Sequence, residues 1–411
     1  MTTSSLADAV LPLVRTRADL HRWGVANEHG RQMHAAVDIL QAAIPTADPS
    51  EAHAVTHQAL ASAITVIARA DDSSGIIGDA CRRLLDLHPR TAAAARVPVG
   101  KLIDWMMTFQ FNGEVDFFEL DPVAYAPALG NTGVAAYRAR LDAVRSGLGP
   151  EPPASQPWAD LDPHRRWVLE WNDRRLAVLY HDIDAIIRTH AKDQKVAAWL
   201  QDTAKAFEEI DEIDLAIDWA RQALDIGPWH QSLQAGDYWC ELLAQHRPDE
   251  LLDARLLVFR RWPTSATAAR LHNAAGTTWP GYRDEVVATL SASPREAVLF
   301  ALLTLKDIPF AWDLAHSLGL GDDRTWSELV NEYEHVDPLA VLPIHARLVE
   351  NELTEADVQN YRVAARRLAK MRKLAAGSAR AADVDDLIAG LRQRHHRRPR
   401  LQQEFDHAGL P

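Results

Sequence analysis

Two histidines four residues apart offer the first candidate chemistry in this chain, because imidazole nitrogens are good ligands for transition metals. His53 and His57 lie in the run "DPSEAHAVTHQALASAITVIARA", whose apolar spacing and Asp48 cap predict a helix. Residues four apart share a helix face, so the pair could supply two ligands to one ion. However, Ala54 stands where an H-E-x-x-H motif has glutamate, and the sequence identifies no third ligand. We therefore expect two surface histidines, with no metal and no other cofactor.

A pair of glycines in "DDSSGIIGDA" is the second candidate. Gly75 and Gly78 open a predicted helix, and the free N–H groups at a helix start can bind an anion. The Lys-Ser/Thr of a phosphate-binding loop is absent, and Asp71 and Asp72 would repel a phosphate. This pattern therefore favours a tight turn that caps the next helix.

Catalytic motifs find little support in the sequence. The run "HDIDAIIRTH" places His181, Asp182 and Asp184 close together, but this spacing is normal on a solvated helix. The chain contains no nucleophile elbow and no dinucleotide-binding fingerprint. We expect a protein that is not an enzyme.

A strongly basic segment lies near the end of the chain. "LRQRHHRRPRL", Leu391 to Leu401, holds five arginines and two histidines in a chain of net charge −13. From Tyr361 to Arg400 there are 12 Lys+Arg and 3 Asp+Glu, which gives +9 and leaves about −22 for the remainder. Phosphate contacts from such a segment would add salt-dependent affinity for nucleic acid. The candidate contact residues are Lys370, Arg372, Lys373, Arg394, Arg397 and Arg398, and Arg400 could contribute as well.

A structural interpretation of the same segment is favoured. Leu387, Leu391 and Phe405 indicate that one side of it is buried. Few aromatic residues are present to stack on bases, and the acidic remainder of the chain would repel DNA. We expect the polar outside of a closing helix, with nucleic-acid association as the alternative.

Composition restricts the class of protein. The 411 residues are 47% apolar and 25% charged, which is typical of a globular chain. The apolar runs are too short to cross a bilayer, and the first residues do not have the pattern of a signal peptide. Cys81 and Cys240 are the two cysteines and can form neither a disulfide framework nor a multi-cysteine zinc site. We expect a cytoplasmic protein without a membrane partner.

The stretch "GLGPEPPASQPWADLDP" is rich in proline, glycine and serine, which predicts a linker. The sequence therefore predicts an N-terminal helical domain over 1–148, a linker over 149–163 and a helical-repeat domain over 164–411 with basic C-terminal helices.

The most informative stretch follows that linker. "VAAWLQDTAKAFEEIDEIDLAIDWARQALDIGPW" predicts two helices around a short acidic turn, with small residues on one face of the second. Ala216, Ala223 and Pro228 match the second helix of a tetratricopeptide-type repeat. A degenerate copy ends at Pro263, 35 residues after Pro228, and further helix pairs are predicted downstream. We expect an all-α, TPR-like helical-repeat solenoid with an N-terminal helical subdomain.

The chain also resembles a known group of proteins. "DSSGIIGDACRRLLDLH", the degenerate repeats and the ending "YRVAARRLAKMRKLAAGSARAADVDDLIAGLRQRHHRRPRLQQEF" resemble the helical region that follows the zinc finger in bacterial SWIM zinc-finger proteins and related families of unknown function. The finger itself needs Cys-x-Cys and Cys-x-His, and Cys240 is followed by Glu241 and Leu242. The resemblance therefore implies a helical fold without the zinc module and without its DNA-binding role.

Thirteen tryptophans are many for this length. They more often form seams between helices than line a binding groove, but Trp229 and Trp239, with the adjacent Tyr238, flank a predicted loop and are the best candidates for partner contact. We expect a non-catalytic scaffold or adaptor that binds another protein through a concave or Trp-lined surface.

Overall fold

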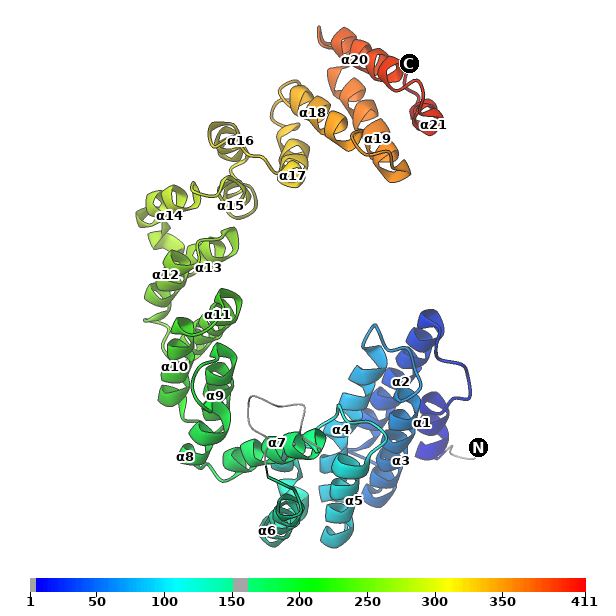
Figure 1. Ribbon diagram of the computed structural model, residues 1–411, viewed down its shortest axis with the longest axis vertical. Coiled ribbons are helices and arrows are strands. Elements are labelled where there is room, and N and C mark those ends of the chain that lie inside the picture. Colours follow the sequence, from blue (N-terminus) through cyan, green and yellow to red (C-terminus); the bar gives the residue numbers. More distant parts are fainter. Residues whose placement is uncertain (1–4, 151–161) are drawn as a thin grey trace. The chain divides into compact units, whose positions relative to one another are not determined.

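The computed structural model describes residues 5–150 and 162–411, and within these ranges the protein is all-helical without a β-strand (Figure 1). The predicted all-α class is therefore confirmed. The helices form two compact units, Met1–Ala235 and Gly236–Pro411.

The described part of the first unit is a succession of helices. They are α1 Leu6–Val14, α2 Trp23–Ala43, α3 Pro49–Ile67, α4 Ile76–Ala94, α5 Val99–Asn112, α6 Pro122–Ser146, α7 Pro163–Leu179, α8 Ile183–Ile186, the π-helical turn η2 Ile187–Ala191, α9 Ala197–Glu209, α10 Ile213–Gln222 and the 3-10 turn η3 Ala223–Asp225. Helix α11 Trp229–His246 contains the division between the units.

The second unit continues in the same manner. Its elements are α12 Leu251–Arg261, α13 Ser265–Ala275, η4 Gly276–Gly281, α14 Arg283–Leu290, α15 Pro294–Leu299, the π-helical η5 Phe300–Leu305, α16 Ile308–Ser317, α17 Asp323–Tyr333, α18 Leu342–Glu352, α19 Val358–Ala375, α20 Ala381–Arg394 and α21 Pro399–His407.

Helices α1 to α4 form the first core of the first unit. Met33, Leu60 and Ile77 are almost completely buried between them. Helix α3 begins where the sequence predicts, because the Asp48 carboxylate accepts hydrogen bonds from the backbone N–H groups of Ser50 and Glu51, both at 3.0 Å. This cap fixes the start of the helix that carries His53 and His57.

The glycine-containing turn before α4 is a cap, as predicted. Gly75 has a φ of 76°, which favours glycine, and directly precedes the helix. The Asp72 carboxylate accepts bonds from the N–H groups of Ile77 (2.9 Å) and Gly78 (2.8 Å). The donors that could have held an external anion are therefore used by the chain itself. Helix α4 then continues through Pro89 to Ala94.

Helix α7 belongs to the first unit, although the predicted linker precedes it. Gln110 donates to the Tyr137 hydroxyl (2.7 Å), which donates to Asn172 Oδ1 (2.7 Å), and Asn172 Nδ2 donates back to Gln110 Oε1 (3.0 Å). All three side chains are buried, and they tie α7 to α5 and α6. These contacts keep α7 with α5 and α6 across the predicted linker 149–163, most of which lies outside the described residues, and the compact units divide at Ala235 and Gly236.

Helices α9 and α10 form the predicted pair. Ala216, Ala220 and Ala223 are completely buried, so small side chains let α10 and η3 pack closely on α9. Trp219 and Leu224 are also buried on that side. The predicted helical face of this pair is confirmed.

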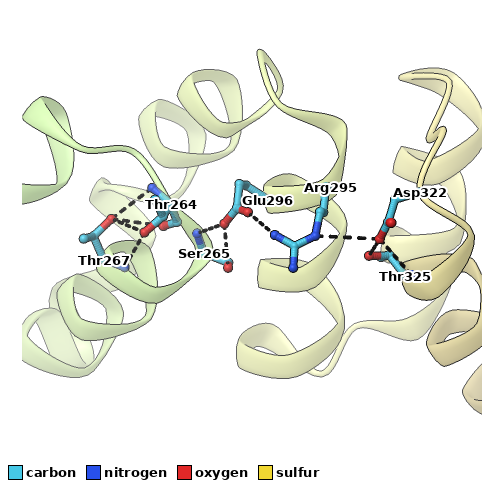
Figure 2. A network of polar contacts seen from close by, with 7 residues as sticks. All are labelled: Thr264, Ser265, Thr267, Arg295, Glu296, Asp322 and Thr325. Carbon is cyan, nitrogen blue, oxygen red and sulfur yellow. Dashed lines mark hydrogen bonds and ion pairs between the residues drawn. The ribbon is translucent and has the colours of Figure 1, made fainter. Parts of the chain in front are cut away.

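In the second unit each helix packs on its neighbours, and α15 also contacts α13 and α17. Figure 2 shows polar contacts that join the starts of these three helices. The Ser265 N–H and hydroxyl donate to Glu296 Oε2 (2.7 and 2.8 Å), and Arg295 pairs with Glu296 (2.8 Å) and Asp322 (3.7 Å). Asp322 in turn caps α17 through the Thr325 N–H (2.9 Å). Their N-termini therefore lie along one edge of this unit.

The last three helices share one core. Leu391, Leu401 and Phe405 are completely buried in it, which confirms the predicted buried side of the basic segment. The segment covers the end of α20, a turn and the start of α21, so its arginines leave the backbone in different directions.

Candidate functional site

Helices α3 and α4 bring three histidines together. His53 and His57 come from α3 and His88 from α4, and one ligand nitrogen from each lies within 4.8 Å of the other two. His88 is completely buried, while His53 and His57 are half-buried. The expectation of two surface histidines is therefore wrong, and His88 is the third side chain that the sequence did not identify.

Hydrogen bonds orient the three rings. His57 Nδ1 lies 3.0 Å from His88 Nε2, and His88 Nδ1 lies 3.0 Å from the Tyr125 hydroxyl. His53 Nδ1 lies 3.3 Å from the Thr91 hydroxyl, which donates its own hydrogen to the carbonyl oxygen of His88 (3.0 Å). Each ring therefore has a defined position relative to the other two.

An aromatic side chain closes one side of this cluster. The Trp105 ring stacks on His88 with centroids 4.1 Å apart and meets His57 edge to face at 5.6 Å. Burial lowers the pKa of His88 to about 3, and the neighbouring His53 and His57 lower it too. Burial also lowers the pKa of His53 and of His57. All three imidazoles are consequently neutral near pH 7 and keep lone pairs available.

The proline after His88 explains why the sequence did not identify the third histidine. His88 ends the quoted run "DSSGIIGDACRRLLDLH" and precedes Pro89, a residue that usually disrupts a helix. Because α4 continues past Pro89, Thr91 lies on the same helix and can reach His53. A prediction that extended this helix past Pro89 would have placed His88 and Thr91 on one helix.

The predicted partner-contact residues differ in exposure. Trp229 is 64% exposed at the first position of α11, whereas Trp239 is 6% exposed and Tyr238 is half-buried. Trp239 is therefore a packing residue, because its ring is covered by the protein core. Trp171 and Trp219 are also seam residues, and Trp171 donates to the Leu120 carbonyl (2.8 Å). Trp158 lies outside the described residues.

Most candidate phosphate contacts in the basic segment have partners within the chain. Lys370 pairs with Glu334 (2.6 Å) and Arg372 with Asp385 (2.8 Å). Arg394 pairs with Glu350, Arg398 donates to the Leu353 carbonyl (2.7 Å), and Arg400 pairs with Glu404 (3.0 Å). Lys373 and Arg397 are exposed. Five of the seven candidate contact residues therefore have a partner within the chain.

The acidic and histidine residues near α8 have structural roles. Asp182 caps α8 by accepting a bond from the Ala185 N–H (2.9 Å), and His181 occupies the preceding turn with a φ of 52°. A nearby groove of about 370 Å³ is lined by residues that include Arg145 and Asp173, which pair with each other at 2.7 Å. The opposite charges of Arg145 and Asp173 offset one another in this groove.

The fold and the site define an all-helical protein whose first unit holds a partly buried cluster of three histidines. Across the described residues, no helix combines the length and the apolar character required to cross a bilayer. The model of a family of unknown function, DUF6880, matches residues 13–272, which is more than half of the chain, so the protein belongs to this family. No curated protein matches the chain. The matched region contains all three histidines.

Proposed function

We propose that this protein is a non-catalytic, TPR-like scaffold or adaptor of the cytoplasm that binds another protein through a surface containing Trp229. The proposal includes the repeat pattern of Ala216, Ala223 and Pro228 and the resemblance to the helical region of SWIM zinc-finger proteins. Stacked helix pairs, such as α9 with α10 and the α13, α15 and α17 series, support it. Such arrays offer long binding surfaces.

The observation that carries the proposal is the exposure of Trp229. Its side chain is 64% exposed at the start of α11, beside the exposed His230. A tryptophan in water forgoes a large hydrophobic stabilisation, and tryptophan is enriched among the residues that dominate binding energy. Trp229 is therefore the best anchor for a partner, whereas the nucleic-acid alternative is weakened by the internal ion pairs of the basic segment.

The chain offers a matched control for testing this anchor. Trp23 is 59% exposed and is likewise the first residue of its helix, α2. Affinity capture with the full chain, followed by a titration of the purified partner, would compare Trp229→Ala with Trp23→Ala. We expect the first change to weaken binding roughly 30-fold or more, as for a hot spot, and the second to leave it nearly unchanged. Equal affinity of both variants and the wild type would refute the anchor.

A further inference from the structure

We infer that His53, His57 and His88 form a binding site for one divalent transition-metal cation of the zinc type, a function separate from partner binding. Three imidazole donors from two packed helices converge within 4.8 Å. Imidazole suits zinc, copper, nickel and iron, whereas calcium and magnesium require oxygen ligands. Three histidines with one water are a known coordination set for Zn²⁺.

Thr91 fixes which nitrogen of His53 can bind the metal. The Thr91 hydroxyl donates its hydrogen to the His88 carbonyl (3.0 Å), so toward His53 Nδ1 at 3.3 Å it can act only as an acceptor. His53 Nδ1 therefore carries the proton, and its Nε2 holds the lone pair. In a metal-bound histidine, one ring nitrogen usually donates its N–H to a neighbouring acceptor while the other binds the metal through its lone pair.

Tyr125 provides the same arrangement for His88. The Tyr125 hydroxyl lies 3.0 Å from His88 Nδ1 and can accept a hydrogen bond from the Nδ1–H group, which leaves Nε2 as the ligand atom. His88 Nε2 in turn faces His57 Nδ1 at 3.0 Å. Two neutral imidazoles at this distance must share one hydrogen, because two lone pairs would repel each other. When His57 carries its hydrogen on Nε2 instead of Nδ1, both facing nitrogens offer a lone pair, and a cation between them binds the two.

The separations fit a small cation. Ligands that lie about 2.0–2.1 Å from a tetrahedral Zn²⁺ are about 3.3 Å from one another. The His57–His88 pair at 3.0 Å is already close to this value. A small shift of the half-buried His53 side chain that keeps its bond to Thr91 brings in the third nitrogen, which already lies within 4.8 Å. Because His53 and His57 are only half-buried, the fourth position opens to water, which completes the coordination and limits the desolvation cost of the ion.

The test uses the untagged full-length protein and Zn²⁺ at neutral pH, with calorimetric titration for affinity and Co²⁺ absorption for geometry. We expect one equivalent of Zn²⁺ in the wild type and a tetrahedral Co²⁺ spectrum. His57→Gln and His53→Gln, each at a half-buried position, should weaken Zn²⁺ binding by more than about 100-fold. Thr91→Val removes an outer hydrogen bond and should weaken it by about 10–100-fold.

His34→Gln is the matched control. His34 is a half-buried histidine of α2 whose ring nitrogens lie near the Ile76 carbonyl (3.1 Å) and Arg83 (3.0 Å), outside the cluster. This variant should bind Zn²⁺ like the wild type. Absence of a Zn²⁺ equivalent in the folded wild type, or equal affinity in His57→Gln and His34→Gln, would overturn the assignment and leave an aromatic packing cluster.

Discussion

The three-histidine cluster and the arginine-rich segment 391–401 are both sets of polar side chains, but they behave in opposite ways. His57 and His88 are 31 residues apart in the chain and meet at 3.0 Å. The five arginines of the segment are almost contiguous, and yet Arg392 pairs with Asp406 of α21 (2.8 Å) while Arg394 pairs with Glu350 of α18. Closeness along the chain therefore did not produce convergence in space.

The difference also concerns energetics. A buried polar group that loses its partner costs about 1–3 kcal/mol, whereas an exposed ion pair contributes about 0–1 kcal/mol. The interior polar groups should therefore control stability, and the surface arginines should contribute little.

Asn172→Ala should cause the largest loss of stability. The change leaves the buried Tyr137 hydroxyl and Gln110 Oε1 without the partners that they have at 2.7 and 3.0 Å. We expect the free energy of unfolding of the first unit to fall by about 2–4 kcal/mol, measured by urea denaturation. Asn331→Ala is the control, because Asn331 is exposed and accepts a bond from Lys370 (2.8 Å). Equal losses in both variants would contradict the contrast between interior and surface.

His345 should make the second unit sensitive to acid. It is completely buried on α18, and burial, followed by Arg367 and Lys370, lowers its pKa to about 4. Since an unfolded histidine has a pKa near 6.5, the unfolded chain binds a proton below that pH and the folded chain does not. Stability is therefore complete above about pH 6.5 and falls toward pH 4, by up to about 1.4 kcal/mol per pH unit.

Unfolding titrations of wild type and His345→Gln between pH 7 and 4.5 would measure this contribution. The other buried histidines affect both proteins equally, so the difference isolates His345. The variant should show the shallower decline with falling pH. Parallel curves would contradict the lowered pKa of His345 in the folded protein.

Arg394→Ala should have a small effect on stability. Its ion pair with Glu350 joins side chains that are 55% and 39% exposed, so water and salt screen the interaction. We expect a change of less than about 0.5 kcal/mol in the free energy of unfolding. A loss as large as that of Asn172→Ala would show that the surface pairs hold the closing helices together.

The protein should not bind random duplex DNA through its basic segment. A salt titration of binding should reveal neither appreciable affinity at low salt nor a steep dependence on salt concentration, because the acidic remainder of the chain repels DNA. Lys373→Ala with Arg397→Ala, the two exposed positions, should change nothing. Tight binding that weakens steeply with salt and in this double variant would restore the nucleic-acid alternative.

The fold class and much of the helix register could be predicted from the sequence. The Asp48 cap of α3, the α9–α10 pair with its buried Ala216 and Ala220, and the buried side of the last helices all follow from local spacing and capping rules. The compact-unit division at Ala235 and Gly236 could not be predicted. The contacts of Gln110, Tyr137 and Asn172, which meet only in the tertiary structure, tie α7 to α5 and α6 across the predicted linker.

Only two of the three residues of the candidate metal site could be predicted from the sequence. The spacing of His53 and His57 defines a pair on one helix face, but the choice of His88 depends on how α3 packs on α4. Pro89 added to the difficulty, because a proline usually interrupts a helix and here lies within α4. The exposure of Trp229 and the burial of Trp239 on the same helix likewise depend on packing.

The most direct measurement is anomalous diffraction at the zinc absorption edge, from crystals of the untagged protein grown with one equivalent of Zn²⁺. We predict a peak about 2.0–2.1 Å from His53 Nε2, His57 Nδ1 and His88 Nε2. The metal site would be contradicted if no anomalous density lay among the three rings and His57 stayed hydrogen-bonded to His88 at 3.0 Å.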